Sequence, residues 1–99
     1  MTELEQLQAS AGQAAALLKA MSNPRRLLIL CMLCGTPGTS AGDLARATGL
    51  SPSATSQHLA RMREEGLIDS QRDAQRILYS IKNAAVNSLI ATLKTLYCP

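Results

Sequence analysis

The 99-residue chain contains no tryptophan, no phenylalanine and only two tyrosines, Tyr79 and Tyr97. Sites that stack single-stranded bases or enclose drug-sized ligands depend on aromatic side chains. This composition therefore argues against both kinds of site. One domain over residues 1–99 also leaves little room for an enzyme scaffold around an enclosed substrate cavity. We expect a protein that binds a partner, and we do not expect an enzyme.

Long apolar runs and acidic residues are scarce as well. The longest uninterrupted apolar stretch, residues 27–34, is far shorter than the roughly 20 residues of a membrane-spanning helix. The first residues carry Glu3 and Glu5 and lack the basic segment of a secretory signal. We therefore expect a cytoplasmic protein with no membrane partner. Basic residues exceed acidic ones by ten to seven, and most are arginines, which suit bidentate contacts with phosphate and guanine.

Cysteine is rare and odd in number, with Cys31, Cys34 and Cys98. Because the cytoplasm keeps thiols reduced, we expect no structural disulfide framework. Cys31 and Cys34 form a C-x-x-C motif inside an apolar helix, whereas redox motifs of this kind open a helix after a strand. A zinc site would need two further ligands, and the chain offers only Cys98 and the single His58. We expect no metal and no other cofactor, and the residue pattern leaves haem undecided.

Apolar periodicity and capping residues divide the chain into five expected helices and one hairpin. Apolar residues recur at steps of three and four in the first helix, which is typical of a seam that packs against another helix. Residues 27–34 of the second helix are apolar on every side, so we expect them at the buried centre. The signals for helix starts and ends are Asn23-Pro24, Ser40, Gly49, Ser51-Pro52, Gly66 and Asn83. The expected helices are residues 4–21, 24–34, 41–48, 52–65 and 84–97.

A helix-turn-helix is formed by the two short helices joined around Gly49. After them, residues 67–72 and 75–81 are strand candidates, with Asp73-Ala74 as the turn of a β-hairpin. We therefore expect a mainly α winged helix-turn-helix with the hairpin as its wing. The first and last helices carry apolar seams that have no place inside the compact middle. We expect these two helices to pair across a two-fold axis in a homodimer.

The fourth helix has the sidedness of a DNA-reading helix. Its inward side is marked by Ala54, His58, Leu59 and Met62. The opposite side has no acidic residue before Glu64, and its serine, glutamine and arginine can reach phosphates, adenine and guanine. A merely solvated face is the alternative, and the adjoining turn and basic hairpin favour DNA. For His58 a packing role and a DNA contact both stay open. The candidate contacts of this helix are Ser51, Ser53, Ser56, Gln57, His58 and Arg61.

Two arginines, Arg72 and Arg76, flank the predicted hairpin turn. Long cations at such a tip can follow the minor groove or the phosphates beside it. The nearby Asp69 and Asp73 keep open a second interpretation, in which the tip only improves solubility. We expect the wing and the fourth helix to bind double-stranded operator DNA together.

Over nearly its whole length the chain resembles the ArsR family of dimeric winged-helix repressors. The matching segments are LLKAMSNPRRLLILCML, GDLARATGLSPSATSQHLARMREEGLI and DSQRDAQRILYSI. Metal-sensing members carry a cysteine pair before the turn, or Asp and His ligands on the last helix. This chain has Ser40 and Gly42 at the first place, and residues 83–94 contain no Asp, Glu or His. The resemblance therefore points to the branch of the family that senses sulfide and persulfide.

In that branch one sensing cysteine lies in the second helix and one near the end of the last helix, and Cys31 and Cys98 match those places. The resemblance implies a homodimer that binds an inverted repeat with both thiols reduced. It releases the DNA when a reactive sulfur species joins the thiols as a disulfide or a polysulfide. Cys34 departs from the two-cysteine pattern and is an accessory thiol of undetermined role. A bridge between a core helix and a dimer helix would bias a two-state geometry, as a switch requires.

Three alternatives to this function stay open. The inducer of such a repressor could be a general oxidant or another ligand. A thiol oxidoreductase using Cys31 and Cys34 would need a strand before the motif and a lowered thiol pKa. A helical dimerisation module without DNA is disfavoured by the polar face of the fourth helix.

For the switch itself, we expect an exposed Cys98 to react first and a Cys31 shielded by leucines to close the bridge.

Overall fold

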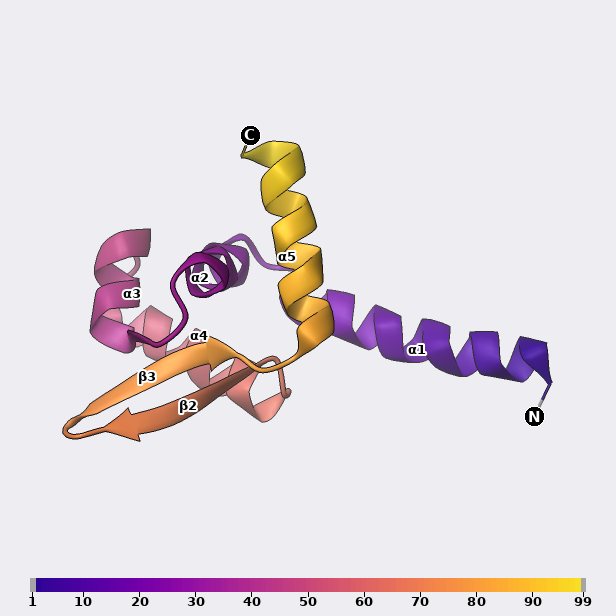
Figure 1. Ribbon diagram of the computed structural model, residues 1–99, viewed down its shortest axis with the longest axis horizontal. Helices are drawn as coiled ribbons and strands as arrows, with labels where there is room; N and C mark the ends of the chain where they lie inside the picture. The colour runs from indigo at the N-terminus through magenta and orange to yellow at the C-terminus, as the bar shows by residue number, and fades with distance from the viewer. Residues whose placement is uncertain (1, 99) are drawn as a thin grey trace.

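The computed structural model describes residues 2–98, which form five helices and a small sheet (Figure 1). The elements are α1 (Glu3–Met21), α2 (Pro24–Gly35), β1 (Thr39–Ser40), α3 (Ala41–Thr48), α4 (Pro52–Glu64), β2 (Ile68–Asp73), β3 (Arg76–Ile81) and α5 (Ala84–Tyr97). The helices match their predicted bounds to within a residue, and their order is the predicted one. Within residues 2–98 no helix offers the length and hydropathy of a membrane span.

Side-chain caps explain where the helices begin. The Oδ1 of Asn23 accepts hydrogen bonds from two backbone N–H groups of α2, at 2.9 and 3.2 Å. Ser40, Ser51 and Asn83 cap α3, α4 and α5 through their side chains in the same way. The helix α3 ends at Gly49, whose φ of +74° is a left-handed conformation that glycine adopts without steric cost. These local signals place α3 and α4 as a helix-turn-helix.

The sheet contains a third strand that the sequence did not predict. β1 pairs antiparallel with β3, with Thr39 opposite Tyr79, and the strand order is β1-β3-β2. The backbone N–H of Gly38 extends this pairing with a 2.9 Å hydrogen bond to the carbonyl of Tyr79. A strand of two residues has no alternation to detect, and its formation depends on a partner far along the chain.

The hairpin turn lies one residue later than predicted. Asp73 pairs with Arg76, so Ala74 and Gln75 form the turn, and the prediction of Asp73-Ala74 was wrong. The strands are correspondingly Ile68–Asp73 and Arg76–Ile81 rather than residues 67–72 and 75–81. Two-residue hairpin turns favour Gly or Asn because they require positive φ, and here Ala74 adopts a φ of +57°. The usual sequence signal for the turn position is therefore absent.

The apolar core lies where α2, α4, α5 and β2 converge. Its fully or nearly fully buried members are Met21, Ile29, Leu30, Leu33, Leu44, Leu59, Met62, Leu67, Ile68, Val86 and Ile90. The helix α2 is buried on one side only, contrary to the expectation of burial all round. Leu28 is 48% exposed, whereas Leu30 is 0% exposed. The reason is that α3, α5 and β3 pack against α2 and leave another side of it uncovered.

The terminal helices leave large apolar side chains in water. The helix α1 projects away from the rest of the chain (Figure 1), and only Leu17, Ala20 and Met21 near its end pack on the core. The exposed large apolar residues of α1 and α5 are Leu4, Leu7, Leu18, Leu96 and Tyr97. Keeping such side chains in water costs free energy unless another surface covers them.

Candidate nucleic-acid interface and thiol cluster

The outer face of α4 is polar and exposed, as the sequence predicts. Its exposed residues include Ser53, Ser56, Gln57 and Arg61. Leu59 and Met62 bury the opposite side in the core, with Ala54 half-buried beside them. The predicted inward and outward sides of this helix are therefore confirmed.

The first turn of α4 depends on Ser51 and Thr55. The hydroxyl of Ser51 accepts a hydrogen bond from the backbone N–H of Ala54 at 3.1 Å, so this candidate DNA contact also caps the helix. Thr55 is fully buried, and its hydroxyl donates to the carbonyl of Ser51 at 2.9 Å. This internal hydrogen bond satisfies the hydroxyl, so Thr55 can occupy an inward position that the hydropathy pattern did not assign to it.

His58 lies half-buried where α4 approaches α2. The Nε–H of Arg26 donates to its Nδ1 at 3.4 Å. Burial and the positive charges of Arg26 and Arg25 lower the pKa of His58 from its usual 6.5, so the ring is neutral near pH 7. Nδ1 of His58 therefore takes part in packing within the chain, which is one of the two roles that the sequence left open. A contact of the other nitrogen with DNA stays a prediction.

The wing carries Arg72 and Arg76 on its two strands, and both side chains are exposed. The Nη2 of Arg76 pairs with Oδ2 of Asp43 at 3.0 Å, and the same carboxylate pairs with Arg46. A hydrogen bond with Ser40, followed by the contacts with both arginines, holds the pKa of Asp43 below its usual 3.8. Asp43 thus ties the wing to the start of α3.

Sequence reasoning missed this acidic tie. The spacing of Asp43 and Arg46, three residues apart on one helix, was a usable signal for their local pair. No pattern in the sequence connects Asp43 with Arg76, because that pair depends on how β3 is placed against α3.

The three cysteines gather where the end of α2 faces the end of α5. Cys31 and Cys34 of α2 are half-buried, and Cys98 is exposed directly after α5. Burial raises the pKa of the Cys31 thiol, and the nearby thiols of Cys98 and Cys34 raise it further. The thiols of Cys34 and Cys98 therefore both lie near enough to Cys31 to affect its pKa. Among residues 2–98 no group of three or more His, Cys, Asp or Glu side chains could hold a metal ion.

Lys94 is a further member of this cluster that the sequence did not single out. Its Nζ donates to the backbone carbonyl of Cys31 at 3.5 Å, near the C-terminal end of α2, where a cation is favoured. Its charge lowers the pKa of the Cys31 thiol and so opposes the effect of burial. The ammonium group therefore favours the thiolate, which is the reactive form of cysteine.

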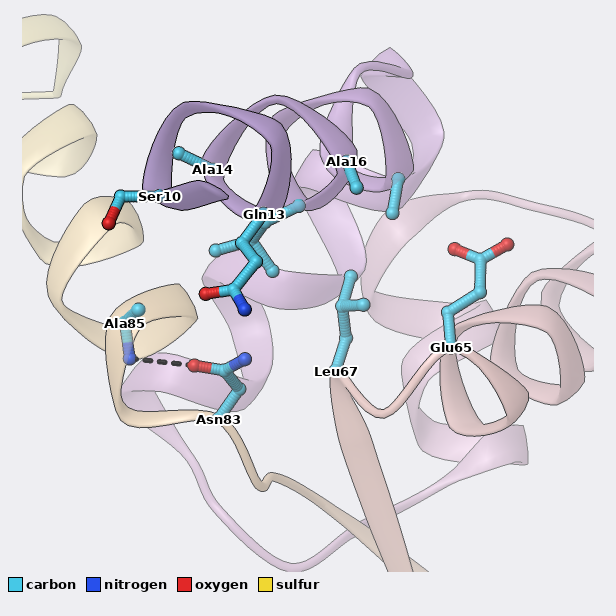
Figure 2. Close-up of a pocket in the computed structure, with 10 residues that line it drawn as sticks. Ser10, Gln13, Ala14, Ala16, Glu65, Leu67, Asn83 and Ala85 are labelled. Carbon is cyan, nitrogen blue, oxygen red and sulfur yellow. Dashed lines mark hydrogen bonds between the residues drawn. The ribbon is translucent and has the colours of Figure 1, made fainter. Parts of the chain in front are cut away.

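Two open cavities flank α1. The larger, of about 720 Å³, lies between α1, the segment joining α4 to β2 and the start of α5 (Figure 2). Its lining includes Ser10 and Gln13 of α1 and the helix cap Asn83, which accepts a hydrogen bond from the N–H of Ala85. The smaller cavity, of about 340 Å³, is lined by Leu18, Met21, Ser22, Leu27, Leu89, Thr92 and Leu93. Much of the surface along α1 is therefore uncovered by its own chain.

Comparisons with known proteins agree with this architecture. The family model for bacterial regulatory proteins of the arsR family matches residues 23–70. The chain is 84% identical to the HTH-type transcriptional regulator YgaV of Escherichia coli K12, over 100% of both sequences. It is 42% identical to the transcriptional activator HlyU of Vibrio cholerae, over 96% of this chain and 87% of HlyU.

Solved structures give the same result. The structure of reduced HlyU from Vibrio cholerae matches with a TM-score of 0.89 and 41% identity, over 96% of this chain and 99% of that one. A homodimeric winged helix-turn-helix DNA-binding domain from Mycobacterium bovis, of a possible ArsR-family regulator, matches with a TM-score of 0.77 and 28% identity. That match covers 97% of this chain and 86% of the other. The predicted winged helix-turn-helix fold is confirmed.

Proposed function

This chain belongs to the ArsR family of bacterial transcriptional regulators, and we propose that it is a homodimeric, cytoplasmic repressor controlled by thiol chemistry. In its reduced form it binds an inverted repeat in operator DNA. A reactive sulfur species then links Cys31 to Cys98 and releases the DNA. The observation that carries the DNA-binding part is the exposed face of α4, with Ser53, Gln57 and Arg61, within the matched segment.

The chemistry of α4 suits the major groove of DNA. Glutamine pairs with adenine and arginine pairs with guanine through two hydrogen bonds each, while serine reaches phosphates or base edges. Arg72 and Arg76 on the wing, together with Arg46 on α3, add cations that suit the adjacent backbone. Asp43 pairs with both Arg46 and Arg76, so the wing and α3 present their positive charges on one surface.

The dimer is supported by the uncovered apolar side chains of α1 and α5 and by the cavities along α1. A second copy of the chain is the simplest surface that covers both helices at once, and the Mycobacterium bovis relative is homodimeric. Two copies would place their α4 helices in successive major grooves about 34 Å apart, which requires an inverted repeat in the DNA.

The proposed switch joins two helices that pack against each other, α2 and α5. The exposed Cys98 thiolate attacks the outer sulfur of a low-molecular-weight persulfide, whose S–S bond breaks and releases a thiol. The Cys31 thiolate then attacks the inner sulfur of the new persulfide, forming a Cys31–Cys98 disulfide and releasing hydrogen sulfide. The two protein thiols are oxidised and the persulfide is reduced. Each additional sulfur atom in a longer bridge consumes one further persulfide and yields one further thiol.

A thiol oxidoreductase that uses Cys31 and Cys34 has weaker support. Both cysteines lie in the second half of α2 rather than at its N-terminus, and burial raises the pKa of Cys31. An efficient thiol oxidoreductase needs the opposite, a thiol with a lowered pKa at the start of a helix. General oxidants stay an alternative class of inducer, which the experiment below compares directly with the persulfide.

The test uses a duplex selected from a random pool by the reduced protein. We expect tight binding before treatment and release after glutathione persulfide, and peptide mass mapping of the treated protein should find Cys31 joined to Cys98 within one chain. Cys31→Ser and Cys98→Ser should bind the duplex normally and stay bound after treatment, whereas Cys34→Ser should respond like the parent. A dominant Cys31–Cys34 link, or release of Cys98→Ser, would overturn the assignment of the pair.

Two further arms decide the inducer and the sign of regulation. Hydrogen peroxide at the same concentration should release the DNA more slowly than the persulfide, and equal rates would favour a general oxidant sensor. In vitro transcription from a promoter that contains the selected repeat should fall when reduced protein is added. An increase would instead match the description of HlyU as an activator.

A further inference from the structure

Arg26 occupies a polar junction between three helices. Its Nη1 donates to the backbone carbonyl of Ala20 in α1 at 2.7 Å and lies 3.5 Å from Oε2 of Glu65 directly after α4. Its Nε donates to Nδ1 of His58 in α4 at 3.4 Å. The Arg26 side chain is only 14% exposed, so these contacts form away from bulk water. A guanidinium group is suited to such a junction because its donors point in several fixed directions in one plane.

This junction matters because α1 has few other ties to its own chain. Most of α1 projects into solvent, and only its last residues pack on the core (Figure 1). Among residues 2–98, the Arg26–Ala20 contact is the one side-chain hydrogen bond that reaches α1 from any residue beyond its C-cap, Ser22. A movement of α1 relative to the core would therefore displace Arg26, which also contacts α4.

The contact with His58 also fixes the chemical form of the ring. The Nε of arginine always carries a hydrogen, so Nδ1 of His58 must be the acceptor. The neutral ring then carries its hydrogen on Nε2. Protonation of Nδ1 would remove the acceptor and place a second positive charge beside the guanidinium.

We infer that Arg26 is a positioning residue that couples the end of α1 to the DNA-reading helix α4 and holds His58 in its neutral form with the hydrogen on Nε2. This inference rests on the proposed function, because it assigns dimerisation to α1 and DNA reading to α4. The inference concerns the connection between α1 and α4 and does not involve the reaction of the thiols. The consequence is that protonation of His58 loosens α4 and weakens DNA binding.

The sign of the pH effect follows from the charges around His58. Arg26 and Arg25 of α2 act on the ring as cations, and Glu65, directly after α4, is the anion paired with Arg26. The helix α3 and the strand β2 also pack against α4. None of their described residues contributes a charge that shifts the pKa of His58. Since the folded pKa lies below the usual 6.5, the junction is intact above that pH and is lost as the pH falls through the folded value.

The first test observes the ring directly, because His58 is the only histidine in the chain. Long-range proton–nitrogen NMR of the reduced full-length protein at pH 7.5 should show the hydrogen on Nε2. Arg26→Gln should give a mixture of both neutral forms and a higher His58 pKa. Arg26→Lys keeps the positive charge but lacks the forked guanidinium group. We expect it to lose the fixed neutral form of His58 as well. A hydrogen on Nδ1 in the parent protein would overturn the inference.

The second test measures DNA affinity against pH on the duplex that the parent protein selects. Parent affinity should fall as the pH is lowered from 7.5 through the folded pKa of His58, which the NMR titration gives, whereas a His58 that only contacts phosphate would bind more tightly as it gains charge. Arg26→Gln should bind about fivefold or more weakly at pH 7.5, a size typical of coupling between sites, and should lose the fall at low pH. Arg25→Gln is the matched control, because it removes a neighbouring exposed charge and should keep both the fixed ring and the fall, which moves toward higher pH since the charge of Arg25 also lowers the His58 pKa.

The outcomes separate this inference from the proposed function. If the parent protein selects no duplex, the proposed function fails, and the NMR result alone decides the state of the ring. If the parent binds but Arg26→Gln has the same affinity and pH profile, the coupling is wrong while the function stands. Circular dichroism checks the fold of each variant. If Arg26→Gln does not fold, Arg26→Lys and the parent protein decide the result.

Discussion

The middle of the chain and its terminal helices differ in how completely they bury leucine side chains. Between α2 and β3, leucines such as Leu30 and Leu44 are 0% exposed, because neighbours in the same chain surround them. In α1 and at the end of α5, Leu7 and Leu96 are 59% and 67% exposed. The difference lies in the neighbours that one chain supplies. The core of the middle is completed by Met21 of α1 and by Val86 and Ile90 of α5, whereas the outer parts of the terminal helices need a second surface to cover their apolar residues.

The helix α2 belongs to both regions. Leu30 faces the core, Cys31 lies toward α5, and Arg26 contacts the end of α1. A displacement of either terminal helix therefore acts on the same helix that packs against α3 and contacts α4 through Arg26. This arrangement gives the proposed Cys31–Cys98 bond a physical connection to the proposed DNA-binding face of α4, which contains no cysteine.

The largest expected effect is the loss of a core leucine. Leu30→Ala removes a fully buried side chain, and the free energy of unfolding should fall by about 2–5 kcal/mol. Leu28→Ala, on the exposed side of the same helix, is the matched control and should cost no more than about 0.5 kcal/mol. Urea denaturation at a fixed protein concentration compares the two variants. Equal losses would show that α2 is buried all round in the functional assembly.

The second effect concerns the terminal helices. Leu7→Glu puts a charge into the proposed dimer seam, and we expect the dimer to weaken by about 2 kcal/mol or more, which is roughly 30-fold in dissociation constant. Helix content should persist, because Leu7 contributes nothing to the core. Gln6→Glu adds the same charge to the neighbouring exposed position and should leave the dimer intact. Sedimentation equilibrium decides, and an undisturbed dimer in Leu7→Glu would place the interface elsewhere.

The predictable part of this fold is the part determined by local signals. Caps such as Asn23 and Ser51, and the helix end at Gly49, gave the helix bounds to within a residue. The sidedness of α4 followed from its own periodicity. The burial of α2 was overestimated, because an apolar pattern does not reveal how many sides of a helix its neighbours cover.

The unpredicted part depends on contacts between distant segments. β1 exists only through its pairing with β3. The contacts of Asp43 with Arg76 and of Arg26 with His58 each join residues more than thirty positions apart. A single sequence carries no signal for such pairs. The candidate residues were therefore predictable by type and helix face, whereas the polar contacts that position them required the fold.

The third prediction compares two kinds of arginine within the middle region. Arg61→Ala on α4 should lose about 1–3 kcal/mol of discrimination between the selected repeat and a mutated one. Arg72→Ala on the wing should weaken both duplexes alike and reduce the slope of log affinity against log salt by about 0.9. Fluorescence anisotropy at several salt concentrations measures both quantities. If Arg61→Ala also weakens both duplexes equally, α4 contributes charge rather than sequence reading.

The smallest expected effect lies where the two regions meet, at Lys94. Its ammonium group lowers the pKa of Cys31, whose midpoint nevertheless lies above the usual 9.0 because burial is the larger influence. Lys94→Met should therefore raise that pKa further and reduce the thiolate fraction at pH 7.5. We expect alkylation of Cys31 by iodoacetamide to slow by roughly two- to fivefold, in a background where Cys34 and Cys98 are serine. Lys82→Met removes the same charge from an exposed position after β3 and should leave the rate unchanged. If Lys94→Met reacts as fast as its parent, the hydrogen bond of Lys94 to the Cys31 carbonyl serves only to fasten α5 to α2, and the terminal helix contributes position but no activation to the thiol.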